Sequence, residues 1–389
     1  MDELGVALIG AGFMGRAHSQ AYEIAQTGAG ADGRFRFRRE IVVEADESRA
    51  AAAAADLGWE RGATSWTEAV EDPSIDIVDI CVPPEFHAEI AMVALEHGKH
   101  VFCEKPIAND LATAERMSRA AADADAVTQV GFNYRNTPAV SFARELLDAG
   151  RLGRPLMFRG QYLQDAAFGA DPNRWRATRA TGGSGMVSDI GSHVIDVGEL
   201  LFGDIVRVSG LVRAIADDTS NGWLTEADRR SERRLDDAGA WIAEFDNGAI
   251  GAFSVNAYSS GRKNELSFAF DGSLGAVEFN WNRREEFRVS YVDEPADHQG
   301  FRTIHTNDQH PGGWWRIAGL GTGYVDVMAI QFQDFATAIL DGRPSAPDFA
   351  TAARVQRIVA AVRHSAETGE WVDVADPDLA DAEAALDAP

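Results

Sequence analysis

Near its start the chain reads Val6-Ala7-Leu8-Ile9-Gly10-Ala11-Gly12-Phe13-Met14-Gly15, a short apolar run that leads into a glycine-rich turn. We expect a helix to follow, through about Gln26. Between a strand and a helix, Gly-x-Gly-x-x-Gly is the dinucleotide-binding fingerprint. The three glycines permit the tight turn, the approach of a pyrophosphate and close packing of helix on strand. The alternative is a purely structural glycine turn.

The alternation of strand and helix continues to about residue 133. Repeated alternation implies parallel strands joined by crossover helices. We therefore expect an α/β Rossmann domain with a doubly wound parallel sheet over residues 1–133. The further strands are expected at residues 41–46, 77–82, 100–103 and 127–132, and the helices between them at 48–57, 85–97 and 109–123.

After about residue 133, strands follow one another without helices between them. Asp246-Asn247-Gly248 is a strong hairpin signal between two of these strands. We expect an α+β domain over residues 134–389, with a largely antiparallel sheet and closing helices near 327–340 and 350–368. The polar stretches 214–237 and 293–322 are expected to be loops, and the acidic residues 373–389 a flexible tail.

The charge balance excludes several classes of partner. Among 389 residues the net charge is −25, so we expect neither nucleic acid nor an anionic membrane as a partner. No apolar run is long enough for a membrane helix, and Met1-Asp2-Glu3-Leu4 has no basic flank of a signal peptide. We expect a cytoplasmic protein. Two cysteines, Cys81 and Cys103, exclude a disulfide framework and a four-thiolate zinc site, and are expected to be packing residues.

An acid at the end of the second strand points to the cofactor. Asp46 stands where a carboxylate binds the hydroxyls of the adenosine ribose and repels a ribose phosphate, which favours NAD over NADP. Arg49 is close by and could tolerate such a phosphate. The alternative is that Asp46 is an ordinary turn residue at a strand end.

Glu104-Lys105-Pro106 follows the strand at residues 100–103. The carboxyl ends of parallel strands face the ligand crevice, so Lys105 is placed to hydrogen-bond a substrate hydroxyl. A solvated surface lysine is the alternative.

A second candidate element is the stretch from Gly182 to Asp196, which reads as glycines followed by a helix. Asp189 and His193 are four residues apart and would share one helix face. An imidazole beside a carboxylate suits proton transfer near neutral pH. A core histidine or a surface ion pair are the alternatives, and no third ligand is compelling enough to predict a metal.

These motifs together resemble the glucose–fructose oxidoreductase / inositol dehydrogenase (Gfo/Idh/MocA) family. The resemblance runs through Gly10–Gly15, Pro83–His87, Glu104–Pro106 and Gly182–Asp196. It implies a Rossmann domain followed by a domain with a large open sheet, commonly buried in dimers or tetramers, so we expect a homo-oligomer. It also implies a cis peptide bond before Pro106, as is frequent in the family.

The resemblance implies a reaction as well. Lys105, Asp189 and His193 would line the reactive centre, with His193 taking the proton of a secondary sugar or cyclitol hydroxyl while hydride leaves for NAD. Lys105 would stabilise the developing negative charge, and Asp189 would favour the imidazolium. The expected cofactor contacts are Gly10, Gly12, Phe13, Met14, Gly15, Asp46, Arg49, Cys81, Val82, Pro83, His87, Glu104, Lys105, Asn133, Trp175 and Arg176.

Within the family, the stretches Gly131–Val140, Tyr162–Asp165 and Gly321–Tyr324 are similar to an enzyme type that oxidises the third carbon of an anhydrosugar. The expected substrate contacts are Lys105, Tyr134, Gln164, Asp165, Asp189, His193 and Tyr324. Gln164 and Asp165 could instead merely end a strand. An inositol dehydrogenase, an NAD-dependent glycosidase that oxidises transiently and a non-catalytic sensor are the alternative functions.

Overall fold

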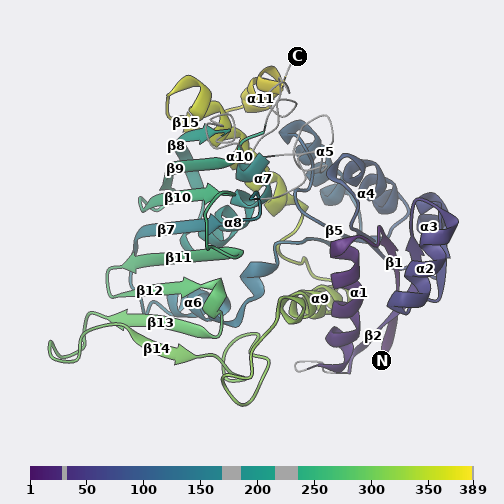
Figure 1. Cartoon of the computed structure of the whole chain (residues 1–389), viewed down its shortest axis with the longest axis horizontal. Helices are drawn as coiled ribbons and strands as arrows, with labels where there is room; N and C mark the ends of the chain where they lie inside the picture. The colour runs from purple at the N-terminus through teal and green to yellow at the C-terminus, as the bar shows by residue number, and fades with distance from the viewer. Residues whose placement is uncertain (29–32, 169–184, 215–234, 388–389) are drawn as a thin grey trace. The chain divides into compact units, whose positions relative to one another are not determined.

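The computed structural model describes residues 1–28, 33–168, 185–214 and 235–387 (Figure 1). Within them the chain forms two compact units. The first holds residues 1–136, 314–316 and 320–354, and the second holds residues 137–313, 317–319 and 355–389, apart from the segments just excluded. The predicted residues Trp175 and Arg176 lie outside the described part of the chain.

The first unit contains a parallel sheet, which confirms the predicted Rossmann fold. Its order is β3-β2-β1-β4-β5-β6, and every neighbouring pair is parallel. The short strand β3 was not predicted, because three residues carry no readable periodicity. The strands are β1 (Asp2–Ile9), β2 (Phe35–Val43), β3 (Arg61–Ala63), β4 (Ile77–Ile80), β5 (His100–Cys103) and β6 (Thr128–Val130).

Helices cover this sheet, and one of them comes from far along the chain. Helix α9 packs against α1, where the rings of Tyr22 and Phe332 stack 4.2 Å apart. Asp46 and Asp110 cap α2 and α5 with their side chains. Helix α5 thus begins after Asp110, and not at residue 109 as expected. The helices are α1 (Phe13–Thr27), α2 (Glu47–Leu57), α3 (Trp66–Glu71), α4 (His87–Glu96), α5 (Leu111–Asp123) and α9 (Tyr324–Asp341), with short 3-10 turns at Pro84–Phe86 and Asn133–Asn136.

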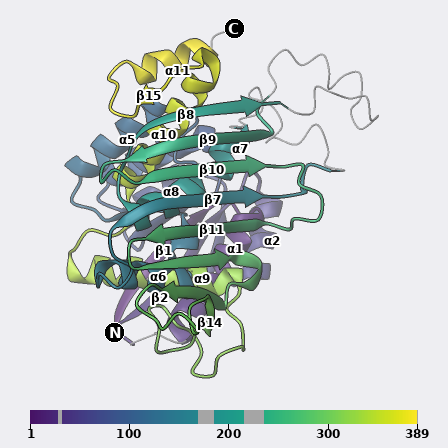
Figure 2. The ribbon, with the colours of Figure 1, turned by 90° about the vertical axis from the view of Figure 1, so that its left-hand side faces the viewer.

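The second unit contains a mostly antiparallel sheet, as predicted (Figure 2). Its order is β14-β13-β12-β11-β7-β10-β9-β8-β15, and β7 with β10 is its parallel pair among the described strands. The strands are β7 (Pro155–Leu163), β8 (Ile205–Arg213), β9 (Ala238–Phe245), β10 (Ile250–Asn256), β11 (Glu265–Gly272), β12 (Gly275–Asn280), β13 (Glu286–Tyr291), β14 (Arg302–His305) and β15 (Val372–Asp373).

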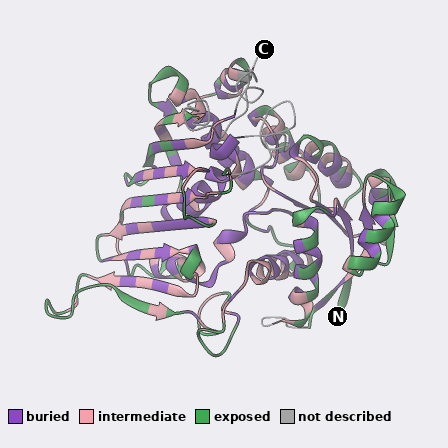
Figure 3. Cartoon of the chain, in the orientation of Figure 1, coloured by how far each residue is buried: buried purple, intermediate pink, exposed green. Residues whose placement is uncertain are grey.

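One face of this sheet is buried and the other is open. Burial alternates residue by residue along β9 and β10, as Figure 3 shows by colour. On the buried face Trp241 and Phe253 stack 5.3 Å apart. The helices of this unit are α6 (Pro138–Asp148), α7 (Gly185–Asp189), α8 (Gly191–Phe202) and α11 (Leu379–Asp387), and α10 (Phe349–Thr368) continues into it from the first unit.

Two expectations for irregular segments are wrong. Residues 373–387 are not a structureless tail, because they include α11 and bury Val374 and Leu379. The stretch 293–322 is not entirely loop, because β14 pairs with β13 at residues 302–305. No helix among the described residues is long and apolar enough to cross a membrane.

Candidate active site

The glycine-rich turn has the form that a dinucleotide requires. Gly10 has φ +97°, a conformation that L side chains rarely adopt. A Cβ on Gly15 would lie 2.0 Å from the carbonyl oxygen of Gly10, so helix and strand pack too closely for any side chain. A Cβ on Gly12 would meet nothing within 4 Å, which leaves open space at the N-terminus of α1. The residues present therefore fit a pyrophosphate at this helix end.

An acid that the sequence reading missed also contacts this turn. One carboxylate oxygen of Glu44 accepts a 2.9 Å hydrogen bond from the backbone N–H of Ala11. The other oxygen lies 2.8 Å from the guanidinium of Arg49. The predicted Asp46 is exposed and caps α2 by accepting the N–H of Arg49. Arg49 is thus paired with a carboxylate, and two acids stand at the end of β2.

The loops after β4 and β5 meet beside this turn. The backbone of Cys81 and the side chain of Val82 lie about 3 Å from the Cβ position of Gly10. His87 is buried, and its two ring nitrogens lie 2.8 Å from the carbonyl oxygen of Val82 and 3.0 Å from that of Pro106. The His87 ring therefore links these two loops from within the protein, and it is not exposed to solvent.

Lys105 follows β5 and is half-buried. The peptide bond to Pro106 is cis, as the family resemblance implied. Glu104 is 5% exposed, and one of its carboxylate oxygens accepts the backbone N–H of Lys105 at 3.1 Å. A Cβ on Gly131 would lie 2.6 Å from the other oxygen, so a glycine is needed there to leave room for this carboxylate.

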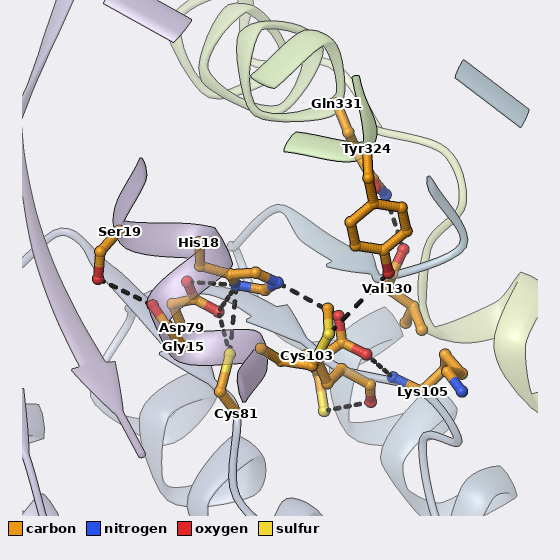
Figure 4. Close-up of polar contacts among 12 residues, drawn as sticks. Gly15, His18, Ser19, Asp79, Cys81, Cys103, Lys105, Val130, Tyr324 and Gln331 are labelled. Atoms are coloured by element: carbon orange, nitrogen blue, oxygen red, sulfur yellow. Dashed lines mark hydrogen bonds and ion pairs between the residues drawn. The ribbon is translucent and has the colours of Figure 1, made fainter. Parts of the chain in front are cut away.

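Three predicted contacts gather near this strand end. The rings of Tyr134 and Tyr324 lie 6.4 Å apart, and the hydroxyl of Tyr324 lies 4.0 Å from the sulfur of Met14. Burial raises the pKa of Tyr324, so its hydroxyl stays protonated. In Figure 4 this hydroxyl points toward the strand end that carries Cys103 and Lys105.

In the second unit, Asp189 and His193 do not share one continuous helix. Helix α7 ends at Asp189 and α8 begins at Gly191, so the predicted one-face spacing spans a break. His193 is 5% exposed, with its ring 6.0 Å from that of Tyr162. Asp189 is half-buried at the break. A turn at Ile190 separates the two residues, and periodicity alone could not reveal it.

Asp236 holds the start of α7 and was expected to be a loop residue. Its carboxylate accepts the N–H of Val187 at 2.7 Å, and its carbonyl oxygen accepts that of Met186 at 3.0 Å. A Cβ on Gly185 would lie 2.1 Å from this carboxylate. Burial raises the pKa of Asp236 to about 6.

The end of β7 carries two predicted substrate residues. Asn264, which the sequence reading missed, accepts hydrogen bonds from the hydroxyl of Tyr162 at 2.6 Å and the amide of Gln164 at 2.8 Å. Asn264 has φ +51°, a backbone conformation that asparagine tolerates. Asp165 forms an ion pair with Lys263, and hydrogen bonding to that lysine lowers the pKa of Asp165.

A buried polar cluster in the first unit was not predicted at all (Figure 4). His18 Nδ1 lies 2.8 Å and 3.0 Å from the two carboxylate oxygens of Asp79, and Nε2 lies 3.2 Å from Glu104. The hydroxyl of Tyr22 donates to Asp79 at 3.0 Å, and the sulfur of Cys81 lies 3.2 Å from His18 Nδ1. The available signals were a charged residue inside an apolar strand and a histidine three residues after the last glycine.

The environment of His18 favours its charged form. Burial by itself would lower the pKa of His18, but the adjacent Asp79 carboxylate and Cys81 outweigh burial, and the pKa stands well above its usual value. The edges of Phe102 and Phe332 pack against the imidazole at 5.3 Å and 5.2 Å. The donor atoms of His18, Asp79 and Cys81 all lie within 4.8 Å of one another.

Known dehydrogenases resemble this chain, some of them over nearly its whole length. It is 37% identical to levoglucosan dehydrogenase of Pseudarthrobacter phenanthrenivorans, over 96% of this chain and 99% of that protein. It is 30% identical to scyllo-inositol 2-dehydrogenase (NAD(+)) of Bacillus subtilis, over 63% of this chain and 65% of that protein. Among solved structures, levoglucosan dehydrogenase in complex with NADH and levoglucosan superposes with a TM-score of 0.89 at 38% identity, over 96% of this chain and 99% of that one.

Two family descriptions match successive parts of the chain. Residues 4–132 match "Oxidoreductase family, NAD-binding Rossmann fold", and residues 140–278 match "GFO/IDH/MocA C-terminal domain". An oxidoreductase domain protein from Kribbella flavida shares the fold of both parts, with a TM-score of 0.88 at 36% identity over 97% of this chain and 100% of that one. The chain therefore belongs to the Gfo/Idh/MocA family of oxidoreductases, and its first domain is an NAD-binding Rossmann domain.

Proposed function

We propose that this protein oxidises a secondary hydroxyl of an anhydrosugar of the levoglucosan type to a ketone, with NAD as the hydride acceptor. The observation that carries the proposal is the likeness to levoglucosan dehydrogenase over 96% of the chain. Lys105, Asp189 and His193 supply the polar groups that the reaction needs. A related cyclitol is the second substrate class, favoured by the likeness to an inositol dehydrogenase.

The glycine-rich turn would hold the pyrophosphate of NAD, and Asp46 would accept hydrogen bonds from the adenosine ribose. The pairing of Arg49 with Glu44 supports NAD over NADP, because a paired arginine offers little attraction to a ribose phosphate. When bound, the cofactor supplies the hydride acceptor. The protein supplies orientation and proton transfer.

The proposed proton chemistry uses His193, Asp189 and Lys105. His193 accepts the hydroxyl proton on a ring nitrogen, and the Asp189 carboxylate favours the imidazolium that results. Lys105 donates a hydrogen bond from Nζ to the same hydroxyl oxygen and stabilises its developing negative charge. A hydroxyl proton and a carbon-bound hydride leave together, so a ketone forms.

Sugar recognition would use polar side chains on rigid supports. Tyr134 and Tyr324 come from the first unit, where both are largely buried. Gln164 and Asp165 come from the end of β7, where Asn264 and Lys263 hold them. Side chains held by such partners lose little freedom on binding, which favours a specific sugar.

The open face of the second sheet supports a homo-oligomer. Leu211, Ile242 and Ile250 are each about half exposed on the strands β8, β9 and β10. A hollow of about 460 Å³ on the same sheet is lined by charges of both signs, including Arg159, Glu278 and Arg288. A second copy would cover these apolar side chains. Light scattering of the purified protein measures the number of subunits.

The deciding experiment records the absorbance of reduced nicotinamide with NAD and NADP in parallel. The panel contains levoglucosan, inositols, glucose, xylose and aryl glycosides. NADH formation with levoglucosan is the expected result, and formation with inositols alone would move the assignment to a cyclitol. Release of an aglycone without net NADH would establish a glycosidase instead, and silence with every compound would overturn the proposal.

A further inference from the structure

We propose that His18 is a positioning residue, which holds Glu104 from within the core so that Glu104 in turn fixes the backbone at Lys105. The inference rests on the proposed function, because it takes Lys105 to be the residue that acts on the substrate hydroxyl. His18 and Asp79 do not touch the substrate in this proposal; they act on Lys105 through Glu104 (Figure 4).

His18 bridges two carboxylates. Nδ1 lies 2.8 Å from Asp79, and Nε2 lies 3.2 Å from Glu104. A ring that donates from both nitrogens is an imidazolium, and it satisfies one oxygen of each acid. His18 and Asp79 are fully buried, so water does not compete for these hydrogen bonds.

The packing around His18 prevents its imidazole ring from rotating. The rings of Phe102 and Phe332 pack against it with their planes at 86° and 83° to the imidazole. The hydroxyl of Tyr22 donates to the same Asp79, so the acid that orients His18 is itself held. The imidazole is thereby locked in one rotamer, and its Nε2 points in one direction.

Glu104 connects the buried His18 to the backbone of Lys105. Glu104 uses one carboxylate oxygen for His18 and the other for the backbone N–H of Lys105, at 3.1 Å. With the two oxygens engaged on different sides, the carboxylate cannot rotate without losing one partner. The direction of the chain at Lys105 is therefore set by a hydrogen-bonded series that begins at Asp79.

Stability alone does not account for this arrangement. Buried ion pairs contribute little to stability, because desolvation offsets most of their mutual attraction, and apolar residues of similar size usually do as well. A group that orients a catalytic residue does gain from such a network, because small misplacements of reacting groups cost large factors in rate. The hydrogen-bonded series from Asp79 to Glu104 ends at the backbone of Lys105, which agrees with a role in orienting that residue.

The same cluster could also be considered as a metal site, since His18, Asp79 and Cys81 lie within 4.8 Å of one another. His18 Nδ1, however, already lies at hydrogen-bonding distance from Asp79 and from the Cys81 sulfur. A cation would have to replace the proton on Nδ1, and the bridge to Asp79 would be lost. Metal analysis of the protein therefore distinguishes the two assignments.

The principal test compares His18→Gln with Ser19→Ala. Ser19 is the next residue of α1 and equally buried, but its hydroxyl bonds Trp59 and the carbonyl of Gly15. We expect kcat of His18→Gln to fall roughly 10-fold to 100-fold, as misplacement of a reacting group does. The Kd for NADH should stay within about threefold, and Ser19→Ala should keep kcat within about twofold. An unchanged kcat in His18→Gln would overturn the proposal.

A double-mutant cycle with Lys105→Ala gives the sharper answer. If His18 acts through Lys105, His18→Gln should change kcat by less than about threefold once Lys105 is alanine, because coupled residues are not additive. Fully additive losses would overturn the positioning role while leaving the proposed function intact. An active Lys105→Ala enzyme would instead overturn the proposed role of Lys105.

Two further measurements keep the proposal testable if His18→Gln does not fold. Asp79→Asn keeps the size of the side chain and removes the charge that orients His18, and we expect a loss of kcat in the same direction, of about tenfold. Wild-type kcat in a folded Asp79→Asn variant would overturn the proposal. Dialysis against EDTA should leave kcat unchanged, and a stoichiometric metal whose removal abolishes activity would replace positioning by a metal site.

Discussion

The buried carboxylate of Asp236 accepts a hydrogen bond of 2.7 Å from the backbone N–H of Val187, in the first turn of α7. This bond joins two segments that are 49 residues apart and anchors the turn that leads to Asp189. The free N–H groups of a helix start need such an acceptor. Asp236 is therefore a support for the predicted base and its partner carboxylate.

The raised pKa of Asp236 predicts a pH dependence of stability. The folded chain keeps the proton up to about pH 6, whereas an unfolded aspartate loses it near 4. Since the folded state binds more protons in this window, the free energy of unfolding falls as the pH rises through it, by up to about 3 kcal/mol. Asp236→Asn removes this contribution, so the variant should gain stability relative to wild type between about pH 4 and about pH 7.

Urea unfolding of wild type and Asp236→Asn at about pH 4 and about pH 7 measures this difference in the free energy of unfolding. Asp56→Asn, which changes an exposed acid on α2, is the matched control and should show no such pH-dependent gain. If the difference in free energy of unfolding between Asp236→Asn and wild type did not vary with pH, the raised pKa of Asp236 would be contradicted.

Lys105 and His193 should each be essential for turnover. General acid–base catalysis contributes at least about a hundredfold, so Lys105→Ala and His193→Ala should each lower kcat by that factor or more. Lys99→Ala and His97→Ala are the controls, because Lys99 bonds the backbone at Asp72 and Ile75 and His97 is exposed on the far end of α4. Near-normal kcat in either alanine variant would remove that residue from the mechanism.

The two acids after β2 should set the choice between NAD and NADP. Asp46→Ala should raise KM for NAD, because it removes the expected acceptor for the ribose hydroxyls. Glu44→Gln should release Arg49 from its ion pair and raise kcat/KM for NADP relative to NAD by about tenfold, which corresponds to about 1.4 kcal/mol. The measurement is the ratio of kcat/KM for the two cofactors, and an unchanged ratio in both variants would show that the ribose is read elsewhere.

Two glycines of the same turn should respond differently to a side chain. Gly15→Ala places a Cβ 2.0 Å from a backbone oxygen, so we expect a loss of thermal stability that is visible without cofactor. Gly12→Val meets no protein atom within 4 Å of its Cβ, so the fold should persist while NADH binding is lost. Melting curves and NADH titration separate the two effects, and NADH affinity equal to wild type in Gly12→Val would contradict the placement of the pyrophosphate.

Asn264 should matter for the sugar and not for the cofactor. Asn264→Ala removes the acceptor shared by Tyr162 and Gln164, so both side chains gain freedom at the end of β7. We expect KM for the sugar to rise about tenfold, equivalent to about 1.4 kcal/mol, with the Kd for NADH unchanged. A larger effect on NADH than on the sugar would contradict the assignment of Gln164 to substrate.

The sequence by itself determined the features that depend on local pattern. The glycine fingerprint, the alternation of strand and helix and the Asp246-Asn247-Gly248 hairpin act over a few residues, and the two sheets and the family follow from them. The roles of Lys105, Asp189 and His193 came from the family pattern and stay predictions. Short β3 and the late helix α11 were missed because their patterns are too brief or too acidic to read.

Only the tertiary structure decided which distant side chains meet. His18 and Asp79 are 61 residues apart, and His18 and Glu104 are 86 apart, so no spacing rule connects them. The support of the α7 start depends on Asp236, and the support of Gln164 depends on Asn264. Burial turns each of these polar groups into an obligatory hydrogen-bond partner, and burial is a property of the packed chain and not of any one segment.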